Sequence, residues 1–417
     1  MTHDEQGVPR SSSPIPQSAI RNPQFSLPPA GSRIHIVGIG GIGTSALARV
    51  LRHWGYAVSG SDAAASDVTA ALAAEGIAVV IGHRAESAAG ADLLVYSAAV
   101  RGDNPELVAA QAAGVPAVKR AALLGLIANA RSPLAVAGTH GKSTTSAMLA
   151  TICDDAGRDP TFFVGAILQD YGTNARPGGG DLVVVEADEY DRSFLQLWPQ
   201  VAVVTNVEHD HPDIYPTYGA MEDAYVEFLA QVRPGGAILL SSDDPGCDRL
   251  ALRIAGGGVA PPRGAAIIRY GRAAGAAWRI EGEGAGAVTV LHDGAAVAEL
   301  TLRVPGEHNR RNALAALAAA SQVGIDPAAA AASLAAFGGI GRRFELKGEV
   351  GQVTVVDDYA HHPTEVATTL RAARERFPGR LIWAVFQPHT FSRTKLLTRE
   401  FAEALAGADR VVLLDIY

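Results

Sequence analysis

The chain has 417 residues, of which 48% are hydrophobic and 19% charged, a composition typical of globular domains and not of disordered or fibrous proteins. A net charge of -8 argues against a nucleic-acid-binding protein, which needs a basic face. Two cysteines are too few for a disulfide framework, and no signal peptide or bilayer-spanning apolar segment is visible. We therefore expect a cytoplasmic protein of two or three domains with no nucleic-acid or membrane partner.

A polar, proline-rich segment precedes the first predicted unit. Residues 1–30 are expected to form a flexible tail without a catalytic role. From 31 to 131 short apolar strands alternate with alanine-rich helical stretches, with strands expected at 34–37, 57–59, 78–81, 93–97 and 117–118. This alternation predicts a parallel, doubly wound sheet.

A second α/β unit is expected from 132 to 342. Strands at 134–137, 182–186, 201–205 and 237–240 accompany a helix over 142–155. Between 264 and 304 short alternating segments split by glycine predict antiparallel hairpins added to this unit. Helices over 309–323 and 327–336 are expected to follow.

The third unit is expected from 343 to 417. Its predicted strands are 354–357, 381–386 and 410–415, with helices at 363–377 and 395–405. The unit is shorter than the roughly 100–150 residues that are usual for a domain. We therefore expect an incomplete domain whose sheet has an exposed, aggregation-prone edge.

A glycine-rich turn, GIGGIG at 38–43, follows the first expected strand and precedes a helix. Glycines there let the backbone approach a pyrophosphate at the helix N-terminus. Asp62 follows at a spacing typical of an acid that binds a ribose. The motif indicates a diphosphate-bearing ligand and by itself favours NAD, while a tight turn without a ligand is the alternative.

A second loop, AGTHGKSTT at 137–145, has the chemistry of a phosphate-binding P-loop. Lys142 would reach the terminal phosphate oxygens, and the Ser143 hydroxyl would hold Mg²⁺. The strict pattern requires a glycine where Val136 stands, so only the arrangement of strand, loop, Lys-Ser and helix matches.

Acidic and histidine side chains follow the next two expected strands. Glu186 opens EADE, and His211 lies in TNVEHDHPD. A carboxylate and an imidazole near one phosphate loop would complete a Mg²⁺ site otherwise made of phosphate and water. A solvated acid and a structural histidine are the alternatives.

Three polar motifs mark the third unit: GRRF at 341–344, DDYAHHP at 357–363 and QPHTFSR at 387–393. The last two follow expected strands, at the sheet edge where open α/β sheets bind ligands. His361 and His362 could suggest zinc, but no further ligands stand at suitable spacing, so zinc is not expected.

Together these motifs resemble the Mur ligase family of peptidoglycan synthesis. From 33 to 417 the chain carries, in order, GIGGIG, GTHGKSTT, EADE, TNVEHDH, GEHNRRNALAA, GRRF, DDYAHHPTEV and FQPHTFSRT. The resemblance is greatest with the branch that adds L-alanine to UDP-N-acetylmuramate, and GRRF, DDYAHHPTEV and FQPHTFSRT carry that finer assignment.

The resemblance implies an α/β protein of three domains. These are a Rossmann-like UDP-sugar-binding domain at 31–131, a central P-loop ATPase domain at 132–342 with a parallel sheet plus a small antiparallel sheet, and a Rossmann-like domain at 343–417 that brings the amino acid. ATP and two Mg²⁺ ions are implied cofactors, with Mn²⁺ able to substitute. The substrate carboxylate would be activated as an acyl phosphate, and the chain would act as a monomer or weak homodimer.

The resemblance also assigns site residues. The uridine diphosphate would be lined by Gly40, Gly41, Ile42, Gly43, Ser61, Asp62, His83 and Ser97. The sugar and lactyl portion would contact Thr173 and Asn174. ATP would be held by Gly138, Thr139, His140, Gly141, Lys142, Ser143, Thr144 and Arg343, with the adenine at His308, Asn309 and Asn312. The metal ligands would be Ser143, Glu186 and His211. L-alanine would be framed by Tyr359, His361, His389 and Arg393. Catalytic roles are implied for Lys142, Glu186, His211, Arg343, His361 and His389, and either of the last two histidines could take the amine proton.

Several relatives carry a carbamylated lysine that bridges the metals, but the stretch 221–233 has no lysine, which agrees with the L-alanine-adding branch. Three alternatives stay open. A recycling ligase would add a tripeptide to the same sugar nucleotide. An NAD-dependent oxidoreductase would leave the loop at 138–143 unexplained, and a ligase fold without activity would only bind.

Overall fold

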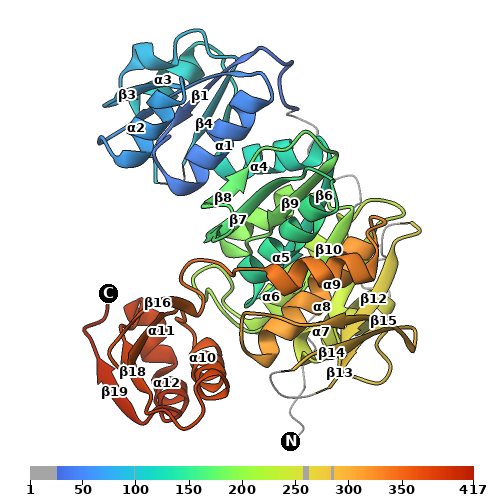
Figure 1. The fold of residues 1–417 in the computed structure, drawn as a ribbon. Coiled ribbons are helices and arrows are strands. Elements are labelled where there is room, and N and C mark those ends of the chain that lie inside the picture. The colour runs from blue at the N-terminus through green and yellow to red at the C-terminus, as the bar shows by residue number, and fades with distance from the viewer. Residues whose placement is uncertain (1–25, 98, 257–262, 283–285) are drawn as a thin grey trace, which may run out of the picture.

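The computed structural model describes residues 26–97, 99–256, 263–282 and 286–417. Three α/β units follow one another along the chain, and the first and third flank the central one (Figure 1). Most of the expected tail, residues 1–25, lies outside the described residues. Within the described ranges, no helix has both the length and the apolar character needed to cross a membrane.

The first unit is built on a parallel sheet with strand order β3-β2-β1-β4-β5. Its strands are β1 (Arg33–Val37), β2 (Ala57–Asp62), β3 (Ala78–Ile81), β4 (Leu93–Tyr96) and β5 (Ala117–Lys119). Its helices are α1 (Ile42–His53), α2 (Asp67–Ala74), the 3₁₀ turn η1 (Ala85–Ala88), α3 (Pro105–Ala112) and α4 (Arg120–Asn129). The predicted doubly wound sheet is confirmed, and strand order reverses beside β1, where the glycine turn leaves the sheet.

The central unit contains a ten-stranded sheet of order β15-β14-β13-β12-β11-β10-β6-β9-β7-β8. The strands are β6 (Ser132–Ala137), β7 (Thr161–Leu168), β8 (Thr173–Arg176), β9 (Leu182–Glu186), β10 (Val201–Val204), β11 (Ala237–Ser241), β12 (Ala266–Gly271), β13 (Trp278–Glu281), β14 (Val288–His292) and β15 (Ala295–Leu300). The expected antiparallel hairpins are present as β13, β14 and β15, and they extend one edge of the same sheet.

Helices cover both faces of this large sheet. They are α5 (Lys142–Asp155), η2 (Tyr190–Gln196), α6 (Tyr218–Leu229), α7 (Pro245–Ala255), α8 (Glu307–Ser321) and α9 (Pro327–Ala336). Along β6, Leu134 and Val136 pack in the core that contains α5 and α8, whereas Ala135 and Ala137 pack in the core that contains α6. Burial on both faces explains why β6 reads as a continuous apolar run.

The third unit contains two two-stranded sheets. An antiparallel hairpin pairs β16 (Glu345–Val350) with β17 (Val353–Asp357), and a parallel pair joins β18 (Trp383–Phe386) to β19 (Arg410–Leu413). The helices are α10 (Pro363–Arg376), α11 (Phe391–Leu396) and α12 (Thr398–Leu405). Strand β16 was not expected from sequence. The helix predicted over 395–405 is instead two helices, because Leu397 leaves helical geometry at φ −112° and ψ 25°.

Candidate active site

The phosphate loop joins the middle of the large sheet to α5. Residues 138–141 leave the carboxyl end of β6, and α5 begins at Lys142. Gly138 and Gly141 have φ of 131° and 81°. A β-carbon would lie 2.0 Å from Oγ1 of Thr205 at the first and 2.6 Å from Oδ1 of Asn312 at the second. Both positions therefore require glycine, and the loop presents the N-terminus of α5 as a phosphate site.

The segment after β10 fixes the shape of this loop. Asn206 accepts a hydrogen bond from the backbone N–H of His140 (2.8 Å) and donates from Nδ2 to the carbonyl of the same residue (2.9 Å). The N–H of Thr139 donates to the carbonyl of Asn206 (3.1 Å). Sequence reasoning missed Asn206, whose signal was a polar pair, Thr-Asn, placed directly after an apolar strand.

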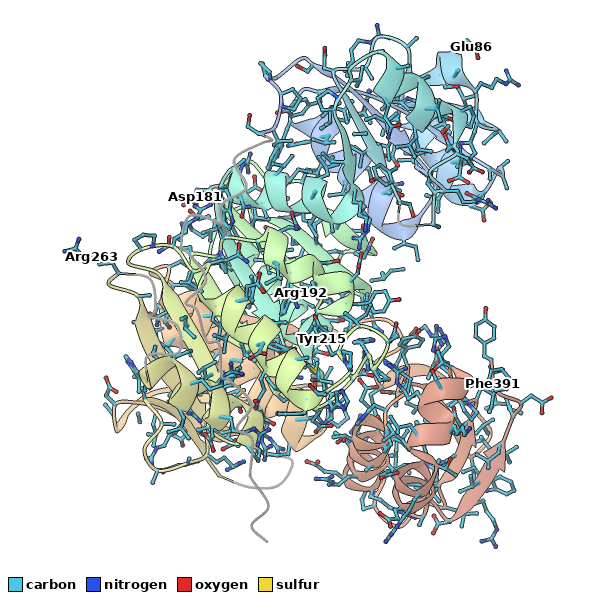
Figure 2. The ribbon with its side chains drawn as sticks, turned by 180° about the vertical axis from the view of Figure 1, so that it is seen from behind. Glu86, Asp181, Arg192, Tyr215, Arg263 and Phe391 are labelled. Atoms are coloured by element: carbon cyan, nitrogen blue, oxygen red, sulfur yellow. The ribbon has the colours of Figure 1, made fainter. Side chains whose placement is uncertain are left out.

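Lys142 turns back beneath the loop. Its Nζ donates to the carbonyls of Gly138 (2.7 Å) and Thr139 (3.2 Å) and to Oε1 of Glu189 (2.9 Å). Burial alone would lower the pKa of Lys142, but the neighbouring carboxylates, Glu189 foremost, outweigh it and hold the pKa above its ordinary value. Tyr215 is a buried residue of the central unit (Figure 2). Its hydroxyl donates to the carbonyl of Glu189 and thereby fixes the turn after β9.

Two of the three predicted metal ligands are in contact. Ser143 Oγ donates to Oε1 of Glu186 (3.0 Å), while the N–H of Gly165 donates to Oε2 (2.6 Å). His211 places Nε2 3.7 Å from Oε1 of Glu189. Oε2 of Glu189 is buried without a hydrogen-bond partner among the described residues. Hydroxyl and carboxylate oxygens are the donors that Mg²⁺ prefers, so the pair of Ser143 and Glu186 fits this ion. Among the described residues, Glu186, Glu189 and His211 do not converge as a three-ligand cluster, so the structure leaves His211 apart from that pair.

A cavity of about 370 Å³ opens over the phosphate loop, between the central and third units. It is lined by eight of the predicted ATP-binding residues: His140, Gly141, Ser143, Thr144, His308, Asn309, Asn312 and Arg343. The cavity lining does not include Gly138, Thr139 or Lys142. The Lys142 side chain is instead held against Glu189. Residues of β11 and β12, including Ser241 and Tyr270, line it as well.

The expected adenine residues occupy the start of α8. Asn312 Nδ2 donates to Oδ1 of Asn309 (3.4 Å), and Asn309 Nδ2 donates to the Pro305 carbonyl (2.7 Å). Burial, followed by the nearby guanidinium groups of Arg371 and Arg343, lowers the pKa of His308 to about 4. His308 is therefore a neutral imidazole at pH 7, and it can both donate and accept a hydrogen bond.

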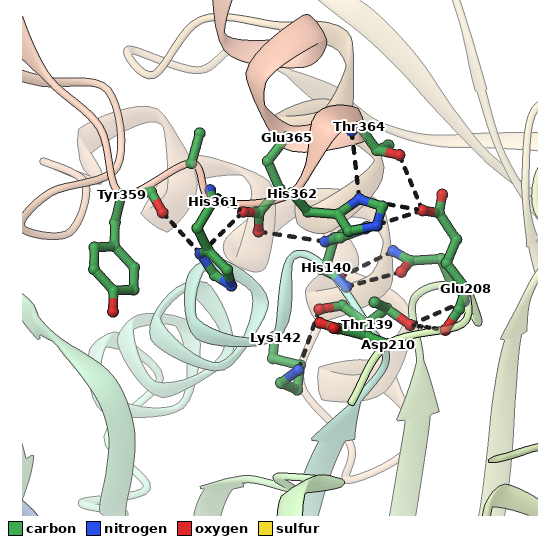
Figure 3. A network of polar contacts seen from close by, with 12 residues as sticks. Thr139, His140, Lys142, Glu208, Asp210, Tyr359, His361, His362, Thr364 and Glu365 are labelled. Atoms are coloured by element: carbon green, nitrogen blue, oxygen red, sulfur yellow. Dashed lines mark hydrogen bonds and ion pairs between the residues drawn. The ribbon is translucent and has the colours of Figure 1, made fainter. Parts of the chain in front are cut away.

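A polar network joins the phosphate loop to the start of α10 (Figure 3). His140 contacts Oε2 of Glu208 through Nε2 (3.2 Å) and Oε1 of Glu365 through Nδ1 (3.3 Å). The two carboxylates outweigh burial and raise the pKa of His140 to about 9. Arg343 also reaches Oε1 of Glu365 (3.3 Å), and Thr364 donates to Oε2 of Glu208 (2.9 Å). Sequence reasoning missed both glutamates, which lie in different units.

Three of the four residues expected to frame the amino acid face the central unit or its network. The rings of Tyr359 and His361 lie 5.2 Å apart. The N–H of His361 donates to Oε2 of Glu365 (2.9 Å). Arg393 Nη2 donates to both carboxylate oxygens of Asp210, at 2.8 and 3.1 Å. The fourth, His389, stacks on Tyr417 at a ring separation of 5.7 Å.

In the first unit the predicted diphosphate residues gather at the carboxyl ends of β1, β2, β3 and β4. The N–H of Gly40 donates to Oδ2 of Asp62 (2.8 Å). Ser61 donates to Glu106 (2.8 Å), and Nδ1 of His83 lies 3.0 Å from the other oxygen of that carboxylate. A β-carbon on Gly38 would touch Cβ of Ser97 at 3.4 Å. Glu106 is fully buried, and sequence reasoning missed it as the residue that fixes Ser61 and His83.

A second cavity, of about 290 Å³, lies between the first and central units. Ile42 and Gly43 line it from the first unit, and Asn174 and Glu186 from the central unit. Thr173 is not a lining residue; its hydroxyl donates to the Ala175 carbonyl (3.0 Å). Glu186 lines this cavity and Ser143 lines the first one, so the two cavities come close to each other at the 3.0 Å hydrogen bond between these residues.

Comparison with known proteins agrees with this geometry. Residues 33–132 match the Mur ligase family catalytic domain, 136–320 the Mur ligase middle domain, and 342–416 the Mur ligase glutamate ligase domain. The UDP-N-acetylmuramate–L-alanine ligase of Kineococcus radiotolerans is 49% identical over 393 residues, covering 92% of this chain and 82% of the relative. The chain belongs to the Mur ligase family.

Other Mur ligases give the same result. The enzyme of that name from Nitratidesulfovibrio vulgaris is 45% identical over 387 residues, covering 92% of this chain and 83% of the relative. The UDP-N-acetylmuramate-alanine ligase of Thermotoga maritima superposes with a TM-score of 0.75 at 31% identity, covering 92% and 85% of the two chains. A murein peptide ligase from Psychrobacter arcticus gives 0.70 at 26% identity, with 92% and 91% covered.

The family resemblance and the α/β fold expected from sequence are thereby confirmed. The GIGGIG turn lies within the residues that match the Mur ligase family, so this turn does not favour the oxidoreductase alternative. The relatives from Kineococcus and Nitratidesulfovibrio carry the L-alanine-adding name, so the tripeptide-adding alternative is not favoured either.

Proposed function

We propose that this Mur ligase joins L-alanine to the lactyl carboxylate of UDP-N-acetylmuramate through an acyl phosphate, and releases ADP and phosphate. The observation that carries the proposal is the hydrogen bond between Ser143, which lines the first cavity, and Glu186, which lines the second. A nucleotide in one cavity and a carboxylate in the other would meet at this point. The relatives named for this reaction, at 45% and 49% identity, support the same choice of substrates.

Phosphoryl transfer requires charge neutralisation more than covalent chemistry. The terminal phosphates of ATP would occupy the N-terminus of α5, where Lys142 exchanges the loop carbonyls for phosphate oxygens. Arg343, which lines the same cavity, would add a second positive charge. Ser143, Glu186 and His211 would hold Mg²⁺, in one or two ions, which supplies further positive charge against the phosphoryl oxygens.

The second half-reaction needs a neutral amine. Burial, with Arg393 and Arg343 also opposing the charge, lowers the pKa of His361, so its imidazole is a proton acceptor at neutral pH. Its Nδ1 donates to the Tyr359 carbonyl (2.9 Å), which leaves Nε2 as the lone-pair nitrogen. We therefore favour His361 over His389 as the base, with Arg393 binding the L-alanine carboxylate.

The decisive experiment measures phosphate release from ATP and Mg²⁺ with UDP-N-acetylmuramate, in separate reactions with L-alanine and with the tripeptide. Release that depends on the sugar nucleotide and on L-alanine supports the proposal. Phosphate release at the same rate without the sugar nucleotide overturns the proposal. Faster release with the tripeptide than with L-alanine would identify the chain as a recycling ligase. Lys142→Ala should abolish turnover while UDP-sugar binding persists, because Lys142 lies outside the second cavity.

We further propose domain boundaries at 31–131, 132–342 and 343–417, each containing its own sheet or sheets. The reaction would take place in the cytoplasm, where ATP and sugar nucleotides are available. A monomer or weak homodimer remains the expected form.

A further inference from the structure

Three side chains of types that can bind metals converge at the boundary of the central and third units. They are His140 of the phosphate loop, Glu208 after β10 and His362 at the start of α10, and their ligand atoms all lie within 4.8 Å of one another. The rings of His140 and His362 are 4.9 Å apart, and His362 is buried. Figure 3 shows both imidazoles directed at the Glu208 carboxylate.

The two distances from Glu208 to the histidines match those in a tetrahedral zinc site. Zinc binds imidazole nitrogen and carboxylate oxygen at about 2.0–2.2 Å, so two ligand atoms of a tetrahedron stand about 3.3–3.5 Å apart. Oε2 of Glu208 lies 3.2 Å from Nε2 of His140 and 3.6 Å from Nδ1 of His362. One ion could therefore replace the contacts between these atoms without a large movement of the backbone.

The surrounding contacts also suit a metal. Histidines that bind metals almost always direct their second ring nitrogen at a carboxylate, carbonyl or water. Nδ1 of His140 lies 3.3 Å from Oε1 of Glu365. The hydroxyl of Thr364 donates to Oε2 of Glu208 (2.9 Å) and holds that carboxylate in place.

We propose that His140, Glu208 and His362 form a binding site for zinc or a similar transition metal, which links the phosphate loop to the third unit. The proton between His140 and Glu208 leaves when the ion binds, and Nδ1 of His362 exchanges its long 3.4 Å contact with the N–H of Thr364 for the metal. Two imidazoles favour zinc over Mg²⁺. The site is separate from Ser143 and Glu186, and it does not depend on the proposed reaction.

The sequence alone could not predict this metal site. His362 stands beside His361 without spaced partners, and Glu208 is 68 residues from His140. Only the folded chain brings the three segments together. Because His140 belongs to the phosphate loop, a bound ion would hold this loop and α10 in their present arrangement.

The test measures Zn²⁺ binding to the full chain after chelator treatment and without nucleotide, by competition with a chromophoric indicator. The variants are His362→Asn and Glu208→Gln. Asparagine keeps a side-chain acceptor for the N–H of Thr364, and glutamine keeps an acceptor for its hydroxyl. His53→Asn, at the exposed end of α1, is the matched control, and His211→Asn reports on metal bound at the proposed Mg²⁺ site.

We expect one zinc per chain in the native protein and in the His53→Asn and His211→Asn variants, and affinity at least about tenfold weaker in His362→Asn and Glu208→Gln. Zinc should also raise the melting temperature of the native chain but not of His362→Asn, and Co²⁺ should show the intense visible bands of a tetrahedral site. Zinc lost only in His211→Asn, or bound equally by all variants, overturns the proposal. So does a native chain that binds none, because the cluster would then be only an ion bridge.

Discussion

Lys142 and Glu189 form an ion pair at the base of the phosphate loop, with 2.9 Å between Nζ and Oε1. The Glu189 side chain is 1% exposed, so it relies on Lys142 for compensation of its charge. The pair joins the loop after β6 to the turn after β9, and thereby couples the stability of the site to the residue expected to bind phosphate.

Replacing Lys142 by methionine should destabilise the central unit by about 3–5 kcal/mol, because Glu189 is left buried without a counter-charge. Adding Glu189→Gln should recover part of that loss, while turnover stays absent from both variants. Urea unfolding of the native chain, both single variants and the double variant measures the coupling. Strictly additive changes in unfolding free energy would show that the pair does not act as a unit.

Gly138→Ala should abolish ATP binding, because its β-carbon would lie 2.0 Å from Oγ1 of Thr205 in a backbone conformation that alanine rarely adopts. Gly157→Ala, after α5, is the matched control: it also has positive φ, but nothing lies within 4 Å of the β-carbon that alanine would add there. That control should lose only about 1–2 kcal/mol of stability and retain ATP binding, measured by calorimetry. Equal loss in both variants would point to backbone strain alone.

The pKa of His308, lowered to about 4 mainly by burial, predicts a pH dependence of stability. In the unfolded chain His308 binds a proton with a pKa near 6.5, whereas in the folded chain it stays neutral down to about pH 4. Above pH 6.5 His308 is neutral in both states and does not lower the free energy of unfolding. As the pH drops from about 6.5 towards 4, only the unfolded chain gains the proton, so the free energy of unfolding falls by at most about 3 kcal/mol.

Unfolding free energies of native and His308→Gln chains across this pH range test the prediction, with His53→Gln as the exposed control. The native and control curves should fall more steeply towards low pH than the His308→Gln curve, which keeps only the contribution of other groups such as His361. Parallel curves for all three chains would assign the acid sensitivity to other groups.

Arg393→Lys should raise the KM for L-alanine about tenfold or more and leave the KM for ATP within about twofold. Lysine carries the charge but lacks the planar fork that holds both oxygens of a carboxylate, as Arg393 now holds Asp210. Arg399→Lys, at an exposed helical pair with Glu403, is the control and should change neither constant. Initial-rate measurements at saturating UDP-N-acetylmuramate separate the two; an equal rise in both KM values would exclude a role specific to the amino acid.

Local signals predicted much of the fold and part of the site. Glycine placement and the following Lys-Ser located the loop between β6 and α5, and the apolar run of β9 placed Glu186 at its end. Contacts across long sequence separations were out of reach: His140 and Glu365 are 225 residues apart. Strand β16 was missed because ELKGEV has little apolar alternation, and its pairing with β17 depends on a neighbouring strand.

Buried polar partners were the other gap. Glu106 lies in a helix, α3, whose start resembles an ordinary acidic first turn, and nothing local shows that His35, Ser61 and His83 converge on it. Glu189 likewise reads as one acid among several in EADEYD. Only the packing of separate strands decides which of these acids is removed from solvent.

The hydrogen bond between a residue of the first cavity and a residue of the second has a use in inhibitor design. A single compound with a nucleotide-like half and an acidic sugar-like half would need only a short connector past Ser143 and Glu186. When the two halves are joined, binding of the second half becomes intramolecular. The affinity of the joined compound would therefore exceed that of either fragment by orders of magnitude. Fragments found separately for each cavity are therefore natural candidates for chemical linking.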